Sequence, residues 1–312
     1  MKFLVTGGAG FIGSNIVKIL LERGHQVTVL DNFSSGYREN LLPFNGKIRL
    51  IEGDIRNKET VFNALEGQES VLHLAASVGN KKSIENPFYD SEHNVFGVLN
   101  VLEGMRHHRI KKIVFSSSAG IFGEPQYMPV DEKHPCEPDS PYGCSKLAGE
   151  KLILSYMKLY GLKSVCLRYF NVYGENQRFD AYGNVIPIFV ARALKGEPIV
   201  IYGDGEQTRD FIHVRDIAMI NVLAAENFET TGVFNLGTGS AITINQLAKS
   251  VREIVGNLNI KIEHQQPRPG DVRHCTANIE RLIKNIGLKP STDVQGLLKN
   301  YIEWMRNDKV KK

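Results

Sequence analysis

The first 24 residues constrain the fold more than any other part of the chain. The segment MKFLVTGGAGFIGSNIVKILLERG begins as a short apolar strand, runs into three evenly spaced glycines and continues as an amphipathic helix. Gly7 permits a tight turn, Gly10 lets backbone approach a pyrophosphate, and Gly13 lets the helix pack closely on the strand. The free N–H groups at the helix start would hold the phosphates. A glycine motif alone is weak evidence, but in this context it predicts a dinucleotide-binding strand–turn–helix unit.

The next strand indicates which dinucleotide to expect. The segment HQVTVLDNFSSG predicts a second strand that ends at Asp31. A carboxylate at this place can accept hydrogen bonds from both hydroxyls of an adenosine ribose, and it would repel a 2′-phosphate. The bland alternative is a carboxylate that merely ends a strand. In this setting we interpret Asp31 as favouring NAD over NADP.

Strands and helices alternate through the first half of the chain. The apolar runs KIRLIEGDI, ESVLHLAA, KKIVFSSS and SVCLRYFNVYG predict further strands, the last of them a sixth strand that ends near Asn171. Helical periodicity fills the intervals at 58–66, 90–107 and 141–160. This alternation predicts an α/β fold, a doubly wound, Rossmann-like parallel sheet covered on both faces.

The predicted sheet also divides the chain. We expect residues 1–172 to form the NAD-binding domain, with a later contribution from about 211–236. Residues 173–312 would mainly form a smaller α/β lobe that binds the substrate. Ligands of such sheets bind at the carboxyl ends of the strands. By this rule the binding edge carries the residues that follow the third, fourth and fifth strands: Asp54, Ala75, Ala76 and Ser118.

Tyr142 and Lys146 stand four residues apart in the segment SPYGCSK. On a helix, positions i and i+4 share one face, so the phenol and the ammonium would point into the same space. A fixed cation favours the ionised phenol and can bring its pKa from near 10 towards about 7, where acid–base catalysis is most effective. Ser118 could hydrogen-bond the same substrate oxygen. This spacing also occurs by chance on many helix surfaces, but on the binding edge it predicts a proton-transfer site.

Composition argues against several other classes of protein. The chain has 312 residues, is 42% hydrophobic and 23% charged, and can therefore bury a large core. Its net charge of +4 is modest, and no basic stripe with interleaved aromatics indicates nucleic acid. No apolar run reaches the length of a membrane span. The four cysteines lack metal-ligand spacing and the N-terminus lacks a signal peptide, so we expect reduced thiols, a cytoplasmic location and no metal.

Several motifs occur in an order that carries a resemblance. They are TGGAGFIGS, GDI, HLAA, SSSAGIFGE, SPYGCSK, LRYFNVYG, RDFIHVRDIA and RPGDV. In this order they resemble the extended short-chain dehydrogenase/reductases of the NAD-dependent epimerase/dehydratase family. Within that family the chain is most similar to the UDP-glucose and UDP-N-acetylglucosamine 4-epimerases. The resemblance spans nearly the whole chain, from Thr6 to about Cys275.

The resemblance implies roles for the residues singled out above. Tyr142 would remove the proton of the sugar 4-hydroxyl, Lys146 would bind the nicotinamide ribose and lower the pKa of the tyrosine, and Ser118 would be the catalytic hydroxyl. Hydride would pass from sugar C4 to tightly held NAD, and would return to the opposite face once the keto sugar has turned over. The cofactor contacts implied by the resemblance fall on Gly7, Gly10, Phe11, Ile12, Gly13, Asp31, Asn32, Asp54, Ile55, Leu74, Ala75, Ala76, Asn94, Tyr142 and Lys146.

Neighbouring residues bear on which reaction of the family to expect. The 4,6-dehydratases place an Asp-Glu pair directly after the catalytic hydroxyl, whereas this chain has Ala119 and Gly120. Dehydration is therefore not expected. Epimerases of glucuronic acid need a cation for the substrate carboxylate, and Arg178 leaves that alternative open. Lys81 and Lys82 also depart from the apolar pattern of many 4-epimerases.

The same resemblance places the substrate. Asn171, Arg209, Arg268 and Asp271 match positions that bind UDP, since guanidinium groups pair with phosphate oxygens and a carboxylate accepts from ribose hydroxyls. Cys275 matches the position that faces the substituent on sugar C2. A bulky aromatic there would restrict the pocket to a hydroxyl, whereas a small side chain leaves room for an N-acetyl group. We therefore expect UDP-GlcNAc and UDP-GalNAc to be accepted alongside UDP-glucose and UDP-galactose.

Three readings of the function remain open at this point. The first is a UDP-sugar 4-epimerase with bound NAD. The second is another nucleotide-sugar epimerase or a reductase of the same fold, for example a UDP-glucuronate 4-epimerase. The third is a non-catalytic sensor of NAD or of a nucleotide sugar. The resemblance further implies a homodimer through the helices at 90–107 and 141–160.

Overall fold

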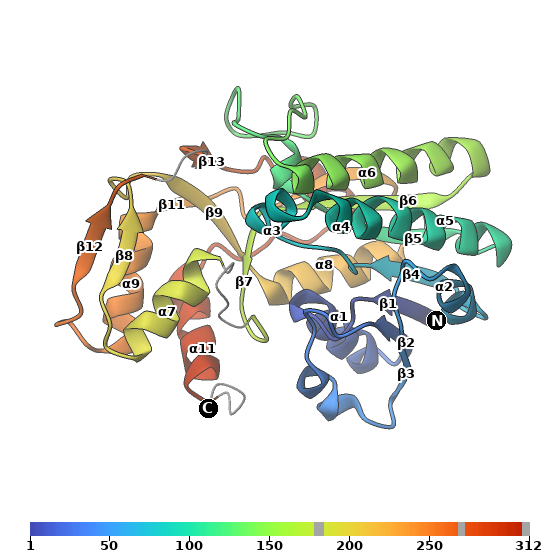
Figure 1. The fold of residues 1–312 in the computed structure, drawn as a ribbon, viewed down its shortest axis with the longest axis horizontal. Helices are drawn as coiled ribbons and strands as arrows, with labels where there is room; N and C mark the ends of the chain where they lie inside the picture. Colours follow the sequence, from blue (N-terminus) through green and yellow to red (C-terminus); the bar gives the residue numbers. More distant parts are fainter. Residues whose placement is uncertain (178–183, 268–271, 308–312) are drawn as a thin grey trace.

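Seven parallel strands form the central layer of the molecule (Figure 1). The computed structural model describes residues 1–177, 184–267 and 272–307. Across the sheet the order is β10-β6-β5-β4-β1-β2-β3, so the direction of winding reverses between β1 and β4 and opens the crevice in which such folds bind ligands. The strands are β1 (Lys2–Thr6), β2 (Gln26–Asp31), β3 (Ile48–Glu52), β4 (Ser70–His73), β5 (Lys112–Ser118), β6 (Lys163–Tyr169) and β10 (Gly232–Leu236).

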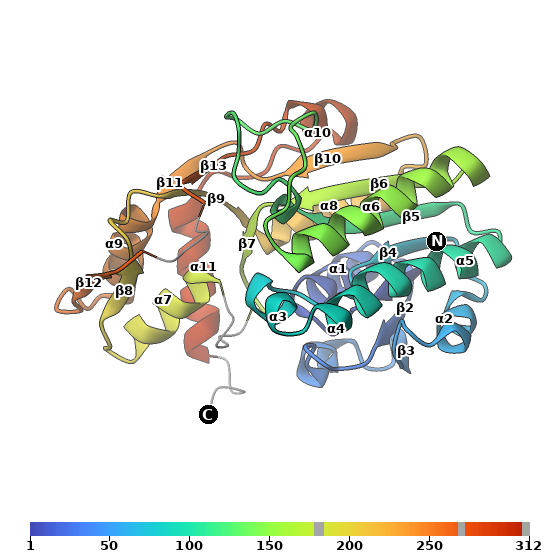
Figure 2. The same ribbon diagram turned by 45° about the horizontal axis from the view of Figure 1, so that its top comes forward.

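Helices cover both faces of this sheet. Successive residues of a strand point to opposite faces, so Phe3 and Val5 enter one core while Leu4 enters the other. α1 (Phe11–Glu22) and α8 (Val214–Glu226) pack together over the first face. α2 (Lys58–Leu65), α5 (Val98–His107) and α6 (Pro141–Tyr160) cover the second, where Figure 2 shows α5 and α6 side by side. The predicted doubly wound α/β fold is confirmed.

One of the predicted helices is built from several pieces. The segment after β4 forms α3 (Asn80–Glu85), α4 (Pro87–Ser91) and a π-helical turn at Glu92–Gly97 before α5 begins. The sequence pattern predicts one continuous helix over 90–107, and the structure divides it. π-helical turns are rare and are found mostly at functional sites.

A smaller lobe stands beside the central sheet. β9 (Thr208–His213) is its central strand and pairs with β7 (Asn171–Tyr173), β11 (Ala241–Thr243) and β13 (His274–Cys275). β8 (Ile199–Tyr202) pairs with β12 (Ile262–Gln265). α7 (Val185–Leu194), α9 (Ile244–Val255) and α11 (Val294–Asn307) enclose a third core, while α10 (Glu280–Ile286) packs against β10. No helix in the described part of the chain is both long enough and apolar enough to cross a membrane.

The predicted sixth strand does end near Asn171, but the chain changes sheet there, which the sequence did not indicate. β6 ends at Tyr169, and the N–H group of Phe170 donates to the carbonyl of Leu236 at 3.0 Å. From Asn171 the chain pairs with Phe211 of β9, in the other sheet. The run LRYFNVY is apolar on both sides of this switch, and hydrophobic pattern does not record a change of pairing partner. The change places Asn171 between the central sheet and the smaller lobe.

Candidate active site

The turn between β1 and α1 contains Gly7, Gly10 and Gly13, and it contacts the loop that follows β4. Gly7 has a φ of 71°, and a Cβ there would lie 2.8 Å from the backbone nitrogen of Ala75. A Cβ on Gly13 would lie 2.1 Å from the carbonyl oxygen of Gly7, which is too close for any residue except glycine. Gly10 is the N-cap of α1 and has no side chain to cap it, which leaves the first-turn N–H groups, including that of Phe11, for an anion.

The carboxylate of Asp31 is held against this turn. It accepts hydrogen bonds from the backbone N–H groups of Ala9 at 2.8 Å and Phe33 at 2.8 Å. Burial raises the pKa of Asp31, and the two N–H groups oppose that rise. The predicted ribose acceptor therefore lies at the end of β2, bonded to the turn that would hold the pyrophosphate.

Asp54 follows β3, the edge strand that pairs with β2, and Asp31 ends β2. The side chain of Asn32 donates to Asp54 Oδ2 at 2.9 Å, and Arg56 donates to both oxygens of the same carboxylate. Burial raises the pKa of Asp54, but the hydrogen bonds from Arg56 and Asn32 outweigh it and lower the pKa to about 2. Ile55 is buried, and its carbonyl accepts from Asn100 of α5 at 2.9 Å. These contacts connect the ends of β2 and β3.

The loop after β4 closes the other side of the turn. The hydroxyl of Thr6 accepts from the N–H groups of Leu74 and Ala75, each at 3.2 Å. Leu74, Ala75 and Ala76 thus lie at the reversal point of the sheet, as was predicted for Ala75 and Ala76 from their place after the strand.

The side chain of Asn94 forms hydrogen bonds with three other residues of the protein. In the π-helical turn, its amide donates to the carbonyl of Ser77 at 3.0 Å and accepts from the Ser77 N–H at 2.9 Å. It also donates to Asp90 at 3.1 Å and to Ser145 at 3.0 Å. Its amide ties the loop after β4 to α6, so Asn94 shapes the predicted cofactor site through these contacts.

The three predicted catalytic residues converge at the end of β5. Ser118 ends that strand, and its hydroxyl accepts from the N–H of Gly120 at 3.0 Å. Tyr142 lies in the first turn of α6 and hydrogen-bonds with Ser118. One turn later, Lys146 is buried and donates to the carbonyl of Ser116 at 2.8 Å. The i, i+4 spacing therefore does bring the phenol and the ammonium to one edge of the sheet.

The protonation of this group differs from the sequence-based expectation. Burial raises the pKa of Tyr142 to about 12, and the hydrogen bond with Ser118 only partly opposes the rise. Burial also lowers the pKa of Lys146 to about 8, against the influence of the fully buried Asp90. In this structure burial outweighs every influence that would lower the tyrosine pKa, and the ammonium of Lys146 is bonded to the carbonyl of Ser116. Sequence reasoning missed Asp90, whose charge raises the pKa of both groups.

Part of the predicted substrate site lies on the smaller lobe. Arg209 on β9 and Cys275 on β13 are direct neighbours in the parallel pairing of these strands. Burial raises the pKa of the Cys275 thiol to about 11, and the charge of Arg209 partly opposes this. The amide of Asn171 donates to the carbonyl of Asp210 at 3.1 Å. Arg178, Arg268 and Asp271 lie outside the described residues.

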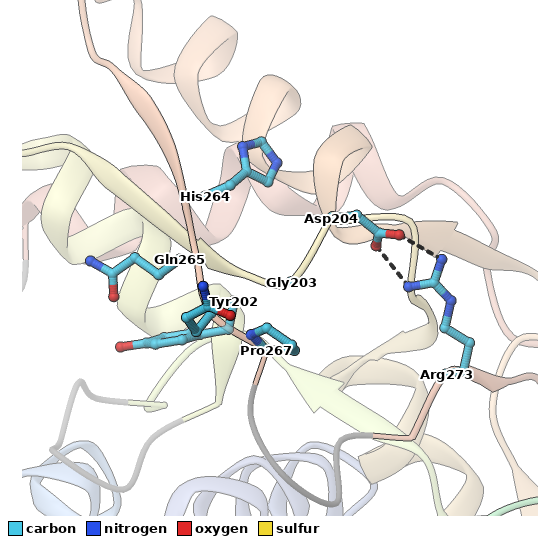
Figure 3. A pocket seen from close by; sticks show the side chains of 8 residues that line it. Tyr202, Gly203, Asp204, His264, Gln265, Pro267 and Arg273 are labelled. Atoms are coloured by element: carbon cyan, nitrogen blue, oxygen red, sulfur yellow. Dashed lines mark hydrogen bonds and ion pairs between the residues drawn. The ribbon is translucent and has the colours of Figure 1, made fainter.

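A cavity of about 830 Å³ opens in the smaller lobe (Figure 3). Part of its lining, up to Pro267, directly precedes Arg268 in the sequence. Asp204 and Arg273 pair across one side, with N–O distances of 2.7 and 2.9 Å. None of the residues that line this cavity was predicted as a site residue, although the two glycines of YGDG have positive φ and mark the turn. The lining residues are Tyr202, Gly203, Asp204, His264, Gln265, Gln266, Pro267 and Arg273.

Lys81 and Lys82 lie on α3. The Lys81 ammonium is 3.9 Å from the carboxylate of Glu85, one turn away on the same exposed helix face. The Lys82 ammonium lies 4.9 Å from the ring centre of Tyr89. Both contacts remain within the α3–α4 segment.

Comparison with known proteins identifies the family. Residues 3–237 match the model of the NAD dependent epimerase/dehydratase family. The chain belongs to the NAD-dependent epimerase/dehydratase family. This confirms the resemblance carried by the motifs, and it identifies NAD as the cofactor of the fold described above.

Individual members of the epimerase/dehydratase family resemble the chain over almost its whole length. It is 37% identical to a UDP-glucose 4-epimerase of Corynebacterium glutamicum, over 96% of this chain and 94% of that one. It superposes on a UDP-N-acetylglucosamine 4-epimerase of Methanobrevibacter ruminantium, solved with UDP-N-acetylmuramic acid, with a TM-score of 0.94 and 37% identity over 98% of both chains. A UDP-glucose 4-epimerase of Thermotoga maritima, solved with UDP-glucose, gives a TM-score of 0.92 and 38% identity over 98% of this chain and 99% of that one.

Proposed function

We propose that this protein interconverts the 4-epimers of a UDP-sugar by transient oxidation at C4 with tightly bound NAD. Its residues fit that cofactor: a Cβ would fill the space at Gly7 and Gly13, and the Asp31 carboxylate lies beside the turn. When bound, NAD supplies the reversible acceptance of hydride. The cofactor half would comprise residues 1–172 together with about 211–236, which is supported by the place of β10 in the central sheet.

The single observation that carries this proposal is the convergence of Ser118, Tyr142 and Lys146 at the end of β5. Tyr142 would remove the proton of the sugar 4-hydroxyl and Ser118 would hydrogen-bond the same oxygen. Lys146 would bind the nicotinamide ribose. Its positive charge, together with the positive charge of oxidised nicotinamide, would bring the pKa of Tyr142 down from about 12 towards the working pH.

The residues after Ser118 favour epimerisation over dehydration. A Cβ on Gly120 would lie 3.3 Å from the hydroxyl oxygen of Ser118 and 3.8 Å from the ring of Tyr142. This is where an acid would have to stand to assist elimination, and neither Ala119 nor Gly120 carries a proton donor. Tyr142 would therefore act on one hydroxyl group alone.

The UDP part of the substrate would lie on the smaller lobe. Arg209 and Cys275 are neighbours there, and the pKa of Cys275 also responds to Glu124 in the loop that follows Ser118. This supports placing Cys275 between the nucleotide and the reacting carbon, where it would face the sugar C2 substituent. Asn171, Arg268 and Asp271 would complete the UDP site.

The small side chain of Cys275 is the reason why we expect both the N-acetylated and the plain UDP-hexoses to be substrates. We expect Cys275→Tyr to reduce turnover of UDP-GlcNAc and UDP-GalNAc by at least about 100-fold, because the ring would occupy the space of the acetyl group. Turnover of UDP-glucose and UDP-galactose should change little. Cys275→Ser is the matched small variant and should keep both activities; an equal loss of both substrate pairs in Cys275→Tyr would contradict the assignment.

Incubation of the purified protein with UDP-GlcNAc, without added cofactor, tests the function. Chromatography should resolve UDP-GalNAc, and Tyr142→Phe should lower the rate at least about 100-fold. Stoichiometric release of reduced cofactor would instead indicate a reductase, and turnover of UDP-glucuronate alone would indicate a glucuronate epimerase. Binding of the nucleotide sugars without any conversion would indicate a sensor.

We further propose that the protein is a homodimer through α5, α6 and the turn before α5. Phe96 of that turn is 61% exposed and Leu159 near the end of α6 is 69% exposed, both on the helices expected at the interface. Light scattering during size-exclusion chromatography tests this. Phe96→Glu combined with Leu159→Glu should give a monomer, while wild-type protein that remains monomeric would contradict the proposal.

A further inference from the structure

Asp90 is a fully buried carboxylate whose hydrogen-bond donors, in the described part of the chain, are both neutral. It lies on α4, which packs against α6, the helix that carries Tyr142 and Lys146. Its Oδ1 accepts from the side-chain amide of Asn94 at 3.1 Å, and its Oδ2 accepts from the hydroxyl of Ser145. Both oxygens are thus held as acceptors, as in an ionised carboxylate. A negative charge is therefore buried beside α6 and bonded to neutral groups.

The position of Asp90 brings this charge close to the two groups proposed for proton transfer. Ser145, which donates to Asp90, is the residue before Lys146, and its hydroxyl is also 3.0 Å from the carbonyl oxygen of Tyr142. Lys146 is buried, so water and salt screen its charge little. Burial lowers the pKa of Lys146, and the carboxylate opposes this; burial raises the pKa of Tyr142, and the carboxylate adds to the rise. One buried charge thus favours the protonated form of both groups.

Other titratable groups around the site are neutral or have partners of their own. Burial lowers the pKa of His73 to about 3, so its ring is neutral. The hydroxyl of Tyr169 donates to Asn221 at 2.8 Å, and Glu150 pairs with Arg168 at 2.7 Å. On the two elements beside α4, the contacts are Lys81 with Glu85, Lys82 with Tyr89, Glu92 with Arg56 and His93 with Tyr89. Among the described residues, the carboxylate of α4 is therefore the charged group that acts on both proton-transfer groups.

We propose that Asp90 is a positioning residue for the proton transfer, and that its charge holds Lys146 as an ammonium and Tyr142 as a neutral phenol until a cation binds beside the ring. Without this charge, so deeply buried a lysine would lose its proton at a lower pH, and the phenol would ionise more easily. With it, the phenol becomes a base only beside a positive charge such as that of oxidised nicotinamide. The inference rests on the function proposed above and adds a residue that sets the pH range of the reaction.

Asp90→Asn removes the charge and keeps the shape. The amide oxygen can still accept from Asn94, and the hydroxyl of Ser145 can turn to the carbonyl of Tyr142, so the fold should tolerate the change. The measurement is kcat for UDP-GlcNAc epimerisation from about pH 5 to about pH 10. Loss of a negative charge lowers both pKa values, so the acid limb and the alkaline limb should both move to lower pH, by about half a unit to one and a half units.

A titration without turnover gives the same information independently of the reaction. Tyrosinate has its own near-ultraviolet absorbance, and subtracting the spectra of Tyr142→Phe isolates one phenol among the 11 tyrosines. In protein saturated with NAD, the midpoint for Tyr142 should lie lower in Asp90→Asn by a similar amount, with the double variant Asp90→Asn, Tyr142→Phe as its baseline. If the wild type converts no UDP-sugar, the proposed function fails, while this titration still decides the role of Asp90.

Two further variants separate the charge from structural damage. Ser145→Ala removes a hydrogen bond to Asp90 but keeps the carboxylate, so both limbs should stay at the wild-type pH even if kcat falls. Glu85→Gln makes the same type of change at a carboxylate of α3 that is 51% exposed, and it should also leave both limbs in place. If Asp90→Asn proves unstable, Asp90→Ser removes the charge with less volume.

Three results would overturn the proposal. Limbs and a tyrosinate midpoint at the wild-type pH in Asp90→Asn would show that no charge of Asp90 reaches the site. A lower kcat at every pH without movement of the limbs would show that Asp90 only holds α4 against α6. Equal movement of the limbs in Ser145→Ala and Asp90→Asn would assign the effect to the hydrogen bond and not to the charge.

Discussion

The central sheet and the smaller lobe hold their candidate ligand residues in different ways. In the central sheet, each key side chain is bonded to the backbone of the same sheet or of the turn that leaves it. Asp31 accepts from the N–H of Ala9, and Lys146 donates to the carbonyl of Ser116. In the smaller lobe, Arg209 and Cys275 lie side by side on strands whose paired stretch is two residues long.

This difference means that the residues proposed for the reaction and those proposed for substrate recognition lie in structurally different surroundings. The groups proposed for proton transfer must keep one geometry, and they are fixed by a long parallel sheet in which every strand supports its neighbours. The groups proposed to recognise the substrate stand on short strands and loops, where a substitution changes the surface without disturbing the main core. The comparison predicts large catalytic effects from the first region and mainly specificity or stability effects from the second.

Two buried lysines give the sharpest test of the catalytic region. Lys146 and Lys112 both have a pKa lowered by burial to about 8, and both donate to backbone carbonyls, but only Lys146 lies at the ligand end of the sheet. We expect Lys146→Met to lower kcat by about 100-fold to 1000-fold, because the cation that favours the ionised tyrosine is lost. Lys112→Met should lower the free energy of unfolding and leave kcat within about twofold.

The same pair predicts a pH dependence. The ammonium of Lys146 is present below pH 8 and is lost as the pH rises through its pKa of about 8. If it is needed for catalysis, kcat should fall above that pH. Lys146→Arg keeps its charge and should move the fall to higher pH. An identical alkaline limb in wild type and Lys146→Arg would show that another group controls it.

Sequence patterns predicted the central sheet well because its determinants are local. Gly7, Gly13 and Asp31 act within one strand–turn–helix–strand unit, and the i, i+4 spacing of Tyr142 and Lys146 needs only the helix between them. The pKa of Tyr142 was not predictable, because its rise comes from burial by residues distant in sequence. The π-helical turn at Glu92–Gly97 was likewise not predictable, because periodicity reads it as ordinary helix.

The smaller lobe was predicted less well for a related reason. Its strands are mostly short, and they pair with segments far away in the chain, so alternation over a few residues carries little signal. The change of sheet at Phe170 falls inside one apolar run. Asp210 shows the same limitation: nothing local in RDFIHV indicates that its carboxylate accepts from Thr238, Gly239 and Ala277.

Asp210 connects the two regions and gives a prediction about stability. Its buried carboxylate accepts from the N–H and hydroxyl of Thr238, which follows β10 of the central sheet, at 2.8 and 2.7 Å. It also accepts from the N–H of Ala277, which follows β13, at 3.1 Å. Asp210→Asn would place an NH₂ group among these donors, and we expect it to lower the free energy of unfolding by about 3 kcal/mol. Urea unfolding measures this.

Asp204 is the matched control for that change. It is an exposed carboxylate in the same lobe, and its ion pair with Arg273 is also exposed. Asp204→Asn should leave the free energy of unfolding close to the wild-type value, because exposed ion pairs contribute little. Equal destabilisation by Asp204→Asn and Asp210→Asn would contradict the role of Asp210 as the connection between the regions.

The smallest predicted effect is on the N-terminal caps of two helices, α6 in the central region and α9 in the smaller lobe. Ser140 caps α6 by accepting from the N–H of Gly143 at 3.1 Å, and Thr243 caps α9 by accepting from the N–H of Gln246 at 3.1 Å. Replacing either by alanine should lower the free energy of unfolding by about 1 kcal/mol. The effects on catalysis should differ, because Tyr142 stands in the first turn of α6 while α9 carries no predicted catalytic residue.

We therefore expect Ser140→Ala to lower kcat by about threefold to tenfold, since fraying of that turn would displace the phenol from Ser118. Thr243→Ala should keep the wild-type kcat at the same loss of stability. Steady-state kinetics well below the unfolding temperature, with both variants fully folded, measures the contrast. Equal kcat values in the two variants would mean that Tyr142 is held by its other contacts, such as the hydrogen bond from its N–H to the hydroxyl of Ser83, and not by the helix cap.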